Sequence, residues 1–260
     1  MAIVKGRNLN WKASPKDERD HAFKMRLTGP ITVLPKSDLS SFVPMITDQG
    51  QTGSCTGFSF KNLYMIRQNQ HNQFDAEPSA LFHYYNARVI EGDADEDAGA
   101  YIRDIIKAAV KQGMCHEKNW PFNENKVTVK PSKAAYKQGL LHQITGYNRL
   151  YGADDVRMSL SFGLPVVYGV VLYDSFMTDT VATTGIVPMP DESTEEIQGG
   201  HAMCLCGHDD SKKMFLGINS WSEQWGHGAG KFKGGFYSIP YAYIDKYCDE
   251  AWNVTSGEQL

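Results

Sequence analysis

The chain has 260 residues, of which 42% are hydrophobic and 22% charged, and its formal net charge is −4. This is the composition of an ordinary soluble globular protein, long enough for one large domain or for two small domains that share a cleft. No run of about 18 apolar residues occurs, and the first residues lack the apolar core of a signal peptide. We therefore expect no membrane partner and a cytoplasmic location, in the virion or host cytoplasm if the source is viral.

Five cysteines are scattered along the chain. The disulfide framework of a secreted protein is denser and uses an even number of cysteines, so we expect reduced thiols here. We also expect a monomer that needs no cofactor.

Residues 1–48 form an N-terminal segment that is basic up to Lys36, with eight Lys or Arg residues against three acidic ones. A basic arm can bind nucleic acid, but this one lacks interleaved aromatic residues and any known motif. We therefore expect no nucleic-acid partner. The segment is predicted to wrap the more acidic remainder of the chain and to pack on its strand-rich half.

The chain is organised around the stretch from Asp48 to Phe60, which starts as a glycine-containing loop and continues as an apolar helical pattern. Cys55 falls at or just before the first turn of this predicted helix. Unpaired backbone N–H groups and the positive end of the helix dipole stabilise a thiolate at such a position, which lowers the thiol pKa and makes a cysteine nucleophilic. Taken alone, the loop is more typical of a small buried cysteine at a helix start.

Two further helices follow. The first begins at Glu77-Pro78-Ser79, where proline suits a first turn, and runs to Val89. The second places apolar residues from Ile102 onward on one face and stops at Gly113. Between them, Glu91 to Gly99 superficially resembles a calcium loop but lacks the glycine and glutamate that such a loop requires at its sixth and twelfth positions, which favours a solvated acidic turn.

The second half of the chain turns from helices to strands. A linker is expected near residues 139–147 and a last helix over 154–162. Strands are predicted over residues 166–173, 202–207, 214–219 and 235–239. Helices first and strands afterwards indicate an α+β fold, with a helical subdomain over 49–140 and a β-rich subdomain over 141–260.

A thiolate nucleophile requires an imidazole that protonates the leaving group and a third group that orients the imidazole. The β-rich half supplies both, in Gly200-His201-Ala202 at the opening of a strand and in Asn219-Ser220-Trp221 after a short hairpin. Together with Cys55, these motifs predict a cysteine-based nucleophilic site between the two halves.

These motifs, in this order, resemble those of the papain-like cysteine peptidases. The resemblance covers roughly residues 43–243, and the stretch from Gly113 to Phe122 is similar to bacterial and viral members that lack a long proregion. It implies a papain-like fold of two domains, a helical left domain and a β-barrel-like right domain, with the active-site cleft between them. The implied activity is a cysteine endopeptidase acting on peptide or protein substrates.

The resemblance also assigns roles in the reaction. Cys55 would be the nucleophile that forms a thioester acyl-enzyme, His201 its general base and acid, and Asn219 the residue that orients the imidazole. Gln49 would donate its side-chain amide to the developing oxyanion, together with the backbone N–H of Cys55. Trp221 would cover the hydrogen bond between His201 and Asn219 and exclude water from it.

The substrate is placed by the same resemblance. Ala98 and Gly99 look like the strip that hydrogen-bonds an extended peptide, since glycine permits close approach. The pocket for the side chain second from the cut would be lined by small or apolar residues, which predicts a preference for hydrophobic side chains. These pocket residues are Tyr101, Ile102, Gly199, Gly200 and Ala202.

Two features depart from the family pattern. Plant and lysosomal members have a cysteine three residues before the nucleophile and a tryptophan directly after it, where this chain has Thr52 and Thr56, so the disulfide from that site cannot form. Those members also carry a long inhibitory N-terminal segment, whereas only 48 residues precede Gln49 here. Control of activity by that kind of prosegment is therefore in doubt.

Other functions are compatible with parts of the sequence. The run from His201 to His208 also reads as a zinc cluster through Cys204, Cys206 and His208, but no second cysteine pair closes a tetrahedral site, which favours buried strand cysteines and no metal. A catalytically silent peptide-binding module of the same fold is a second alternative. An acyl or amide transferase that uses the same Cys–His pair is a third.

Overall fold

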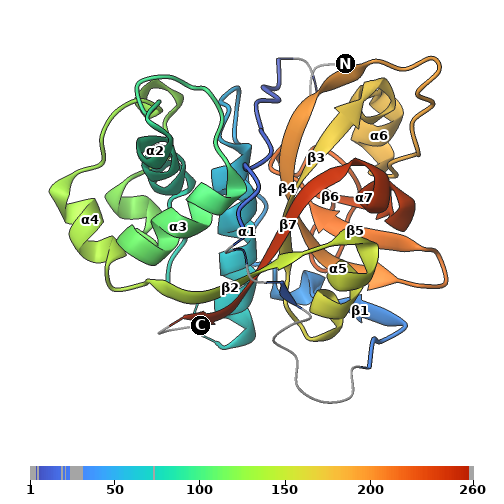
Figure 1. The fold of residues 1–260 in the computed structure, drawn as a ribbon, viewed down its shortest axis with the longest axis horizontal. Helices are drawn as coiled ribbons and strands as arrows, with labels where there is room; N and C mark the ends of the chain where they lie inside the picture. The colour runs from blue at the N-terminus through green and yellow to red at the C-terminus, as the bar shows by residue number, and fades with distance from the viewer. Residues whose placement is uncertain are drawn as a thin grey trace.

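The computed structural model describes residues 4, 6–18, 20, 22–23, 32–72 and 74–257. Four of the basic residues of the N-terminal segment, Lys5, Arg19, Lys24 and Arg26, lie outside these ranges. A helical half and a sheet half stand side by side, and the N-terminal segment runs along the boundary between them (Figure 1). The site predicted between the halves is therefore also close to the N-terminal segment.

The helical half is built around one buried helix. Its helices are α1 (Cys55–Gln70), α2 (Ala80–Glu91), α3 (Ile102–Gln112) and α4 (Lys133–Gly139). Almost all of α1 is buried, because it packs against α2 and α3 on one side and against the sheet on the other. The prediction that Cys55 falls at or just before the first turn of this helix is confirmed.

The ends of α2 and α3 follow local chemistry. Helix α2 starts at Ala80, later than predicted, because Ser79 caps it: the backbone N–H of Phe82 donates to Ser79 Oγ at 3.1 Å. Helix α3 stops at Gly113 as predicted, where the backbone turns to a φ of +73° that favours glycine.

The other half is an antiparallel sheet. Its strands are β1 (Lys36–Asp38), β2 (Ile144–Leu150), β3 (Val166–Tyr173), β4 (Ile197–Asp209), β5 (Met214–Ile218), β6 (Phe236–Pro240) and β7 (Cys248–Gly257). Their order is β2-β7-β3-β4-β5-β6, and β1 pairs with the end of β4. The sheet is not closed, so the β-barrel-like domain expected from the sequence is an open sheet.

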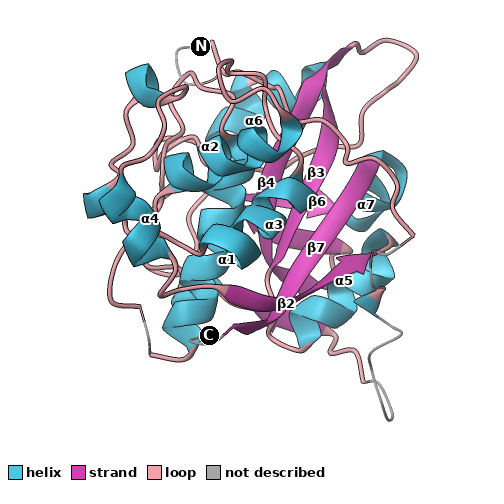
Figure 2. Cartoon of the chain, turned by 60° about the vertical axis from the view of Figure 1, so that its left-hand side comes forward, coloured by secondary structure: helices cyan, strands magenta, loops and turns pink. Residues whose placement is uncertain are grey.

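Short helices complete the sheet half. They are α5 (Gly152–Ser161), α6 (Asp179–Thr184) and α7 (Tyr241–Tyr247). Helices α5 and α7 lie on the side of the sheet away from α2 and α4 (Figures 1 and 2). Short 3₁₀ turns occur at Ser40–Phe42, Glu117–Asn119, Glu124–Lys126 and Asp174–Met177. Within the described part of the chain, no helix is long and apolar enough to cross a membrane.

Part of the predicted linker is a strand. Residues 139–147 were expected to be a loop, whereas β2 starts at Ile144 and pairs with β7. Its register joins Leu150 to Ala251 and Asn148 to Asn253. The pairing partner is about a hundred residues away in the chain, so the local pattern around Ile144 carries no signal of it.

Among the described residues of the helical core, His83 of α2 is an ionisable side chain without a hydrogen-bond partner. Its ring lies between those of Phe60 and Phe82, with centroids at 5.8 and 5.7 Å, and neither ring nitrogen has a hydrogen-bond partner in the described part of the chain. Burial, aided by the nearby positive charge of Lys61, lowers the pKa of His83 to about 3. The imidazole is therefore neutral in the folded protein at pH 7.

This burial predicts a loss of stability in acid. Because the pKa of His83 is lower in the folded state than its ordinary 6.5, the unfolded chain binds the proton first, and the free energy of unfolding falls as pH drops below about 6.5. Between neutral pH and about pH 5, the free energy of unfolding of His83→Leu should fall by about 2 kcal/mol less than that of the parent. Urea unfolding at several pH values measures this difference. His71→Leu, which removes an exposed histidine, is the control; equal pH profiles for the two variants would contradict the prediction.

Candidate active site

Cys55 lies where the helical half meets the sheet. It is the first residue of α1, and Ser54, which precedes it, makes no side-chain cap to the free N–H groups of the first turn. The thiol accepts hydrogen bonds from the backbone N–H groups of Thr56 and of Ala202, the residue after His201 in β4. The structure thus brings the predicted nucleophile against the strand that carries the predicted base.

His201 and Asn219 are paired as the sequence predicts. The Nε2–H of His201 donates to Asn219 Oδ1 at 2.9 Å. Because Oδ1 can only accept, this bond leaves the other ring nitrogen, Nδ1, unprotonated in the neutral imidazole. Nδ1 is buried and has no hydrogen-bond partner among the described residues, so it is available to take a proton.

Trp221 covers this pair. Its indole is fully buried, and its ring centroid lies 5.0 Å from that of His201 at an interplanar angle of 33°. Phe176 and Trp225 pack against the indole in turn. The hydrogen bond between His201 and Asn219 is therefore held in a dry, aromatic environment, where it is stronger than in water.

Gln49 is oriented by a residue that the sequence analysis did not single out. Its carbonyl oxygen accepts from Ser220 Oγ at 2.7 Å, and its Nε2 donates to Thr52 O at 3.0 Å. The backbone N–H of Gln49 also donates to Ser220 O at 3.0 Å. These bonds fix the amide and leave the second N–H of Nε2 as a donor. The position of Ser220 between Asn219 and Trp221 is the only signal that could have pointed to it.

A second missed group ties the acidic turn to the nucleophile loop. The Asp97 carboxylate accepts from the backbone N–H of Gly53 at 2.9 Å and from the Tyr84 hydroxyl at 2.6 Å. The same hydroxyl accepts from the N–H of Gly99 at 3.0 Å. The turn that the sequence presented as solvated thus ties the glycine strip to the loop that precedes Cys55, and the Tyr84 hydroxyl is part of this connection.

The cleft itself is occupied by the chain's own residues 7–14, which we call the cleft segment. At one end Arg7 binds Asp48 at 2.5 Å and the carbonyl oxygen of Trp221 at 3.4 Å. At the other end the N–H of Trp11 donates to Gly200 O at 3.0 Å. The segment is the dark-blue trace between the halves in Figure 1.

The cleft segment lies against the predicted substrate strip. A Cβ on Gly99 would stand 2.0 Å from the carbonyl oxygen of Asn10, and one on Gly199 would stand 2.7 Å from Leu9. Asn10 also forms a β-bridge with Gly200. The segment therefore contacts both halves, and it lies against the positions that the sequence assigned to a peptide substrate.

Burial sets the protonation states of the two predicted catalytic residues. Cys55 and His201 are both fully buried. Burial raises the pKa of the Cys55 thiol to about 12 and lowers that of His201 to about 4. The low thiol pKa expected from the helix start is thus not found in this closed conformation, because desolvation outweighs the hydrogen bonds to sulfur.

The remaining predicted substrate residues stand around the cleft. Ala98 is half-buried beside Gly99, and Ala202 is fully buried on β4. Tyr101 precedes α3 and donates its backbone N–H to Glu91 at 2.9 Å, while Ile102 begins that helix and is buried.

The zinc interpretation finds no support. Cys204 and Cys206 are buried in β4, and the Nε2 of His208 hydrogen-bonds to Ser161 Oγ at 3.1 Å. Among the described residues, no group of three or more His, Cys, Asp or Glu side chains is placed to hold a metal ion.

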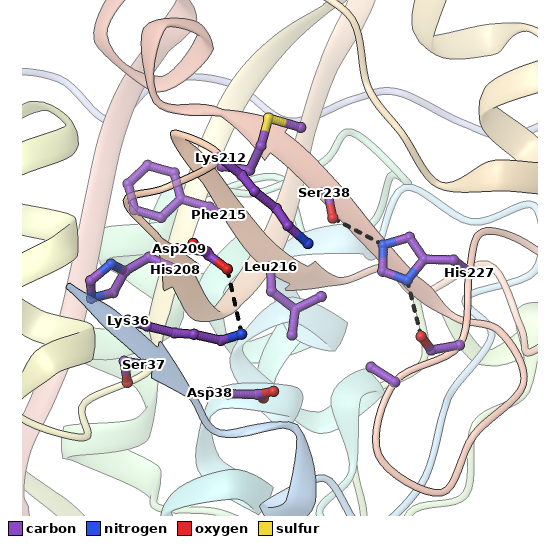
Figure 3. A pocket seen from close by; sticks show the side chains of 13 residues that line it. Lys36, Ser37, Asp38, His208, Asp209, Lys212, Phe215, Leu216, His227 and Ser238 are labelled. Atoms are coloured by element: carbon purple, nitrogen blue, oxygen red, sulfur yellow. Dashed lines mark hydrogen bonds and ion pairs between the residues drawn. The ribbon is translucent and has the colours of Figure 1, made fainter. Parts of the chain in front are cut away.

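A cavity of about 220 Å³ lies elsewhere, beside the paired ends of β1, β4 and β5 (Figure 3). Several of its charged and polar groups pair with one another: Lys36 pairs with Asp209 at 3.4 Å, and His227 hydrogen-bonds to Ser238 at 3.1 Å. It contains none of the residues that the sequence assigned to catalysis.

The family model described as papain family cysteine protease matches residues 35–235. The chain belongs to the papain family of cysteine proteases. Among curated proteins, an uncharacterized peptidase C1-like protein, L477, of Acanthamoeba polyphaga mimivirus is 38% identical over 207 residues, which are 76% of this chain and 64% of that protein. Cathepsin B-like CP2 of Giardia intestinalis is 25% identical over 193 residues, 71% of this chain and 62% of that protein. The chain thus spans less than two thirds of the length of these two relatives.

Solved structures agree with this assignment. Xylellain, a cysteine protease from Xylella fastidiosa, superposes with a TM-score of 0.85 at 29% identity and covers 97% of each chain. The structure of proCathepsin B S9 from Trypanosoma congolense has a TM-score of 0.71 at 16% identity, with 100% of this chain and 89% of that chain covered, and shows likeness of fold alone. The predicted papain-like fold and family are confirmed.

The cleft segment predicts that Cys55 is protected from alkylation. Trp11→Ala removes the buried anchor of the segment, so Cys55 should become exposed, its pKa should fall, and iodoacetamide should modify it at least about 10-fold faster near pH 7. Peptide mass analysis gives the rate at each cysteine. Lys16→Ala, an exposed substitution just beyond the same segment, should leave the rate unchanged; an unchanged rate in a folded Trp11→Ala protein would show that the segment does not protect the thiol.

Proposed function

We propose that this papain-family chain is a cysteine endopeptidase that hydrolyses peptide bonds through a thioester on Cys55. The observation that carries the proposal is the hydrogen bond from His201 Nε2–H to Asn219 Oδ1, because it fixes an unprotonated Nδ1 on the strand whose next residue, Ala202, bonds the Cys55 thiol. A base of known tautomer beside a thiol at a helix start is what thiol activation requires.

The first half of the reaction forms the acyl-enzyme. His201 Nδ1 takes the thiol proton, and the thiolate of Cys55 attacks the carbonyl carbon of the scissile bond. The oxyanion that forms accepts from the free N–H of Gln49 Nε2 and from the backbone N–H of Cys55. His201 then protonates the leaving amine as the C–N bond breaks, which leaves the thioester on Cys55.

The second half restores the enzyme. His201 Nδ1 takes a proton from water, and the hydroxide attacks the thioester carbon at the same oxyanion site. The C–S bond breaks, the acid product leaves, and the proton on His201 returns to sulfur. Asn219 supports both halves because its carbonyl oxygen stabilises the imidazolium that forms in each.

The path of the cleft segment supports cleavage within a chain rather than at its end. The segment enters at Asp48 and Trp221, passes the glycine strip at Gly99, and continues past Ser14. A cleft that holds an extended chain passing through at both ends suits an internal bond of a peptide or protein. The same path requires that the segment leave before a substrate enters.

The test uses the opened protein, Trp11→Ala, and a library of internally varied peptides. Cleavage should be lost with Cys55→Ala and with His201→Ala, and Gln49→Ala should lower kcat by about 10²–10³-fold, since it removes one oxyanion donor. Mass analysis in ¹⁸O-labelled water should show one labelled oxygen in the new carboxylate.

The matched control is Cys115→Ala, which removes a buried thiol of the helical half, far in sequence from the motifs. It should cleave as the parent does. Persistence of cleavage in Cys55→Ala, or its loss in Cys115→Ala while Cys55→Ala remains active, would refute the proposed nucleophile.

A further inference from the structure

One carboxylate joins the loop that precedes Cys55 to the glycine strip. The backbone N–H of Gly53 donates to both carboxylate oxygens of Asp97, at 2.9 and 3.1 Å. This close approach depends on glycine, since a Cβ on Gly53 would stand 3.0 Å from Asp97 Oδ1 and 3.0 Å from the Tyr84 hydroxyl. The loop is therefore held against the acidic turn at the residue two positions before the nucleophile.

The Tyr84 hydroxyl completes the connection. It donates to Asp97 Oδ1 at 2.6 Å and accepts from the backbone N–H of Gly99 at 3.0 Å. The Tyr84 side chain is fully buried, and burial raises its pKa, so the hydroxyl keeps its proton for Asp97. We call Gly53, Asp97, Tyr84 and Gly99 the clamp, because hydrogen bonds through two side chains join the two glycine N–H groups.

Arg88 fixes the middle of the clamp. It follows Tyr84 by one turn of α2, and its guanidinium carbon lies 3.9 Å from the centroid of the Tyr84 ring. The same fully buried side chain donates to Val127 O at 2.6 Å and to Glu96 O, the carbonyl that directly precedes Asp97. One cation thus holds both the ring of the tyrosine and the backbone beside the carboxylate.

Cys55 itself has other supports. Helices α1 and α2 approach so closely that a Cβ on Gly57 would stand 2.6 Å from Ala80 O. The thiol also accepts from the backbone N–H groups of Thr56 and Ala202. Loss of the clamp should therefore leave the thiol in place and release only the loop that precedes it.

The two ends of the clamp serve different parts of the proposed reaction. The loop that contains Gly53 starts at Gln49, whose amide is one proposed oxyanion donor, and Gly99 belongs to the strip proposed to hold an extended peptide. The scissile carbonyl must reach the oxyanion donors while the strip holds the peptide, and a misplacement of about 1 Å can cost about 100-fold in rate. No disulfide shares this task, since all five cysteines are free.

We propose that Asp97 and Tyr84 are positioning residues that fix the glycine strip relative to the oxyanion donors. The inference rests on the proposed function and deepens it, because it names what aligns an extended peptide with the reactive thiol. Both residues act through the N–H groups of Gly53 and Gly99 and not on the reacting atoms. The clamp should therefore matter for substrates that lie on the strip and should matter little for substrates too small to reach it.

The first experiment compares an extended peptide amide with p-nitrophenyl acetate, whose acetyl group is too short to reach the strip. Trp11→Ala, which opens the cleft, serves as the parent. Asp97→Ala should lower kcat for the peptide about 10- to 100-fold with little change in KM, and should change the rate of acylation by the ester less than about 3-fold. Asp97→Asn should restore part of the loss, because its carbonyl oxygen still accepts from the N–H of Gly53.

Tyr84→Phe tests the other side chain of the clamp. It keeps the ring beside Arg88 and removes only the hydroxyl, so the protein should fold and show the same selective loss. Tyr85→Phe, which removes a hydroxyl one residue along α2, is its matched control, and Asp95→Ala, at an exposed position of the same acidic turn, is the control for Asp97→Ala. An unchanged kcat, equal losses with both substrates, or a rise in KM alone would each overturn the inference.

The second experiment needs no hydrolysis. It measures, in the same Trp11→Ala parent, how fast Cys55 is alkylated by a peptidyl chloromethyl ketone, which extends along the strip, and by iodoacetamide, which does not. Asp97→Ala should lower the ratio of the first rate to the second by about 10-fold or more. If the ratio falls in a protein that cleaves no peptide, the positioning role stands and the peptidase function fails. If peptides are cleaved but the ratio and kcat are unchanged, the function stands and the role of the clamp is rejected.

Discussion

The structure depends on the contact between the first turn of α1 and strand β4. This contact joins two halves that are otherwise built separately, and it sets the backbone N–H of Ala202 on the thiol of Cys55. Cys55 comes from the helical half and His201 from the sheet, so the predicted site needs both halves. Because α1 is buried on all sides, its start cannot shift relative to β4 without disturbing both cores. Reactive geometry is thus a by-product of the packing that holds the two halves together.

Desolvation determines the protonation states of Cys55 and His201. A helix start and nearby N–H groups favour a thiolate, yet burial raises the pKa of Cys55 to about 12 and lowers that of His201 to about 4. In this conformation the Cys55 thiol and the His201 imidazole are therefore both neutral near pH 7. The helix dipole and an adjacent imidazolium stabilise a thiolate only where burial does not outweigh them.

Sequence motifs identified the candidate catalytic residues but did not reveal the residues that surround and hold them. Cys55, His201 and Asn219 could be assigned because each sits in a local motif, and the helix that starts at Cys55 and the stop of α3 at Gly113 follow from local propensity and glycine chemistry. Ser220, Asp97 and Tyr84 could not, since their roles are hydrogen bonds to residues far along the chain. The same reason hid β2 in a stretch that reads as a linker, because its partner β7 lies at the other end of the β-rich half. No local pattern indicated that residues 7–14 lie in the cleft, because the contacts of Arg7 with Asp48 and of Trp11 with Gly200 join residues far apart in the chain.

The sheet also anchors the cleft segment. The indole of Trp11 packs over Gly169 and Gly200, where a Cβ would stand 2.0 and 2.8 Å from the ring, and its N–H donates to Glu250 Oε1 at 3.2 Å. A side chain at either glycine would therefore displace the ring. Arg7, which precedes Asn10 in the segment, binds Asp48, and Trp11 follows Asn10, so the contact of Asn10 with Gly99 is held from both sides. The position of the segment thus depends on several parts of the chain that are far apart in sequence.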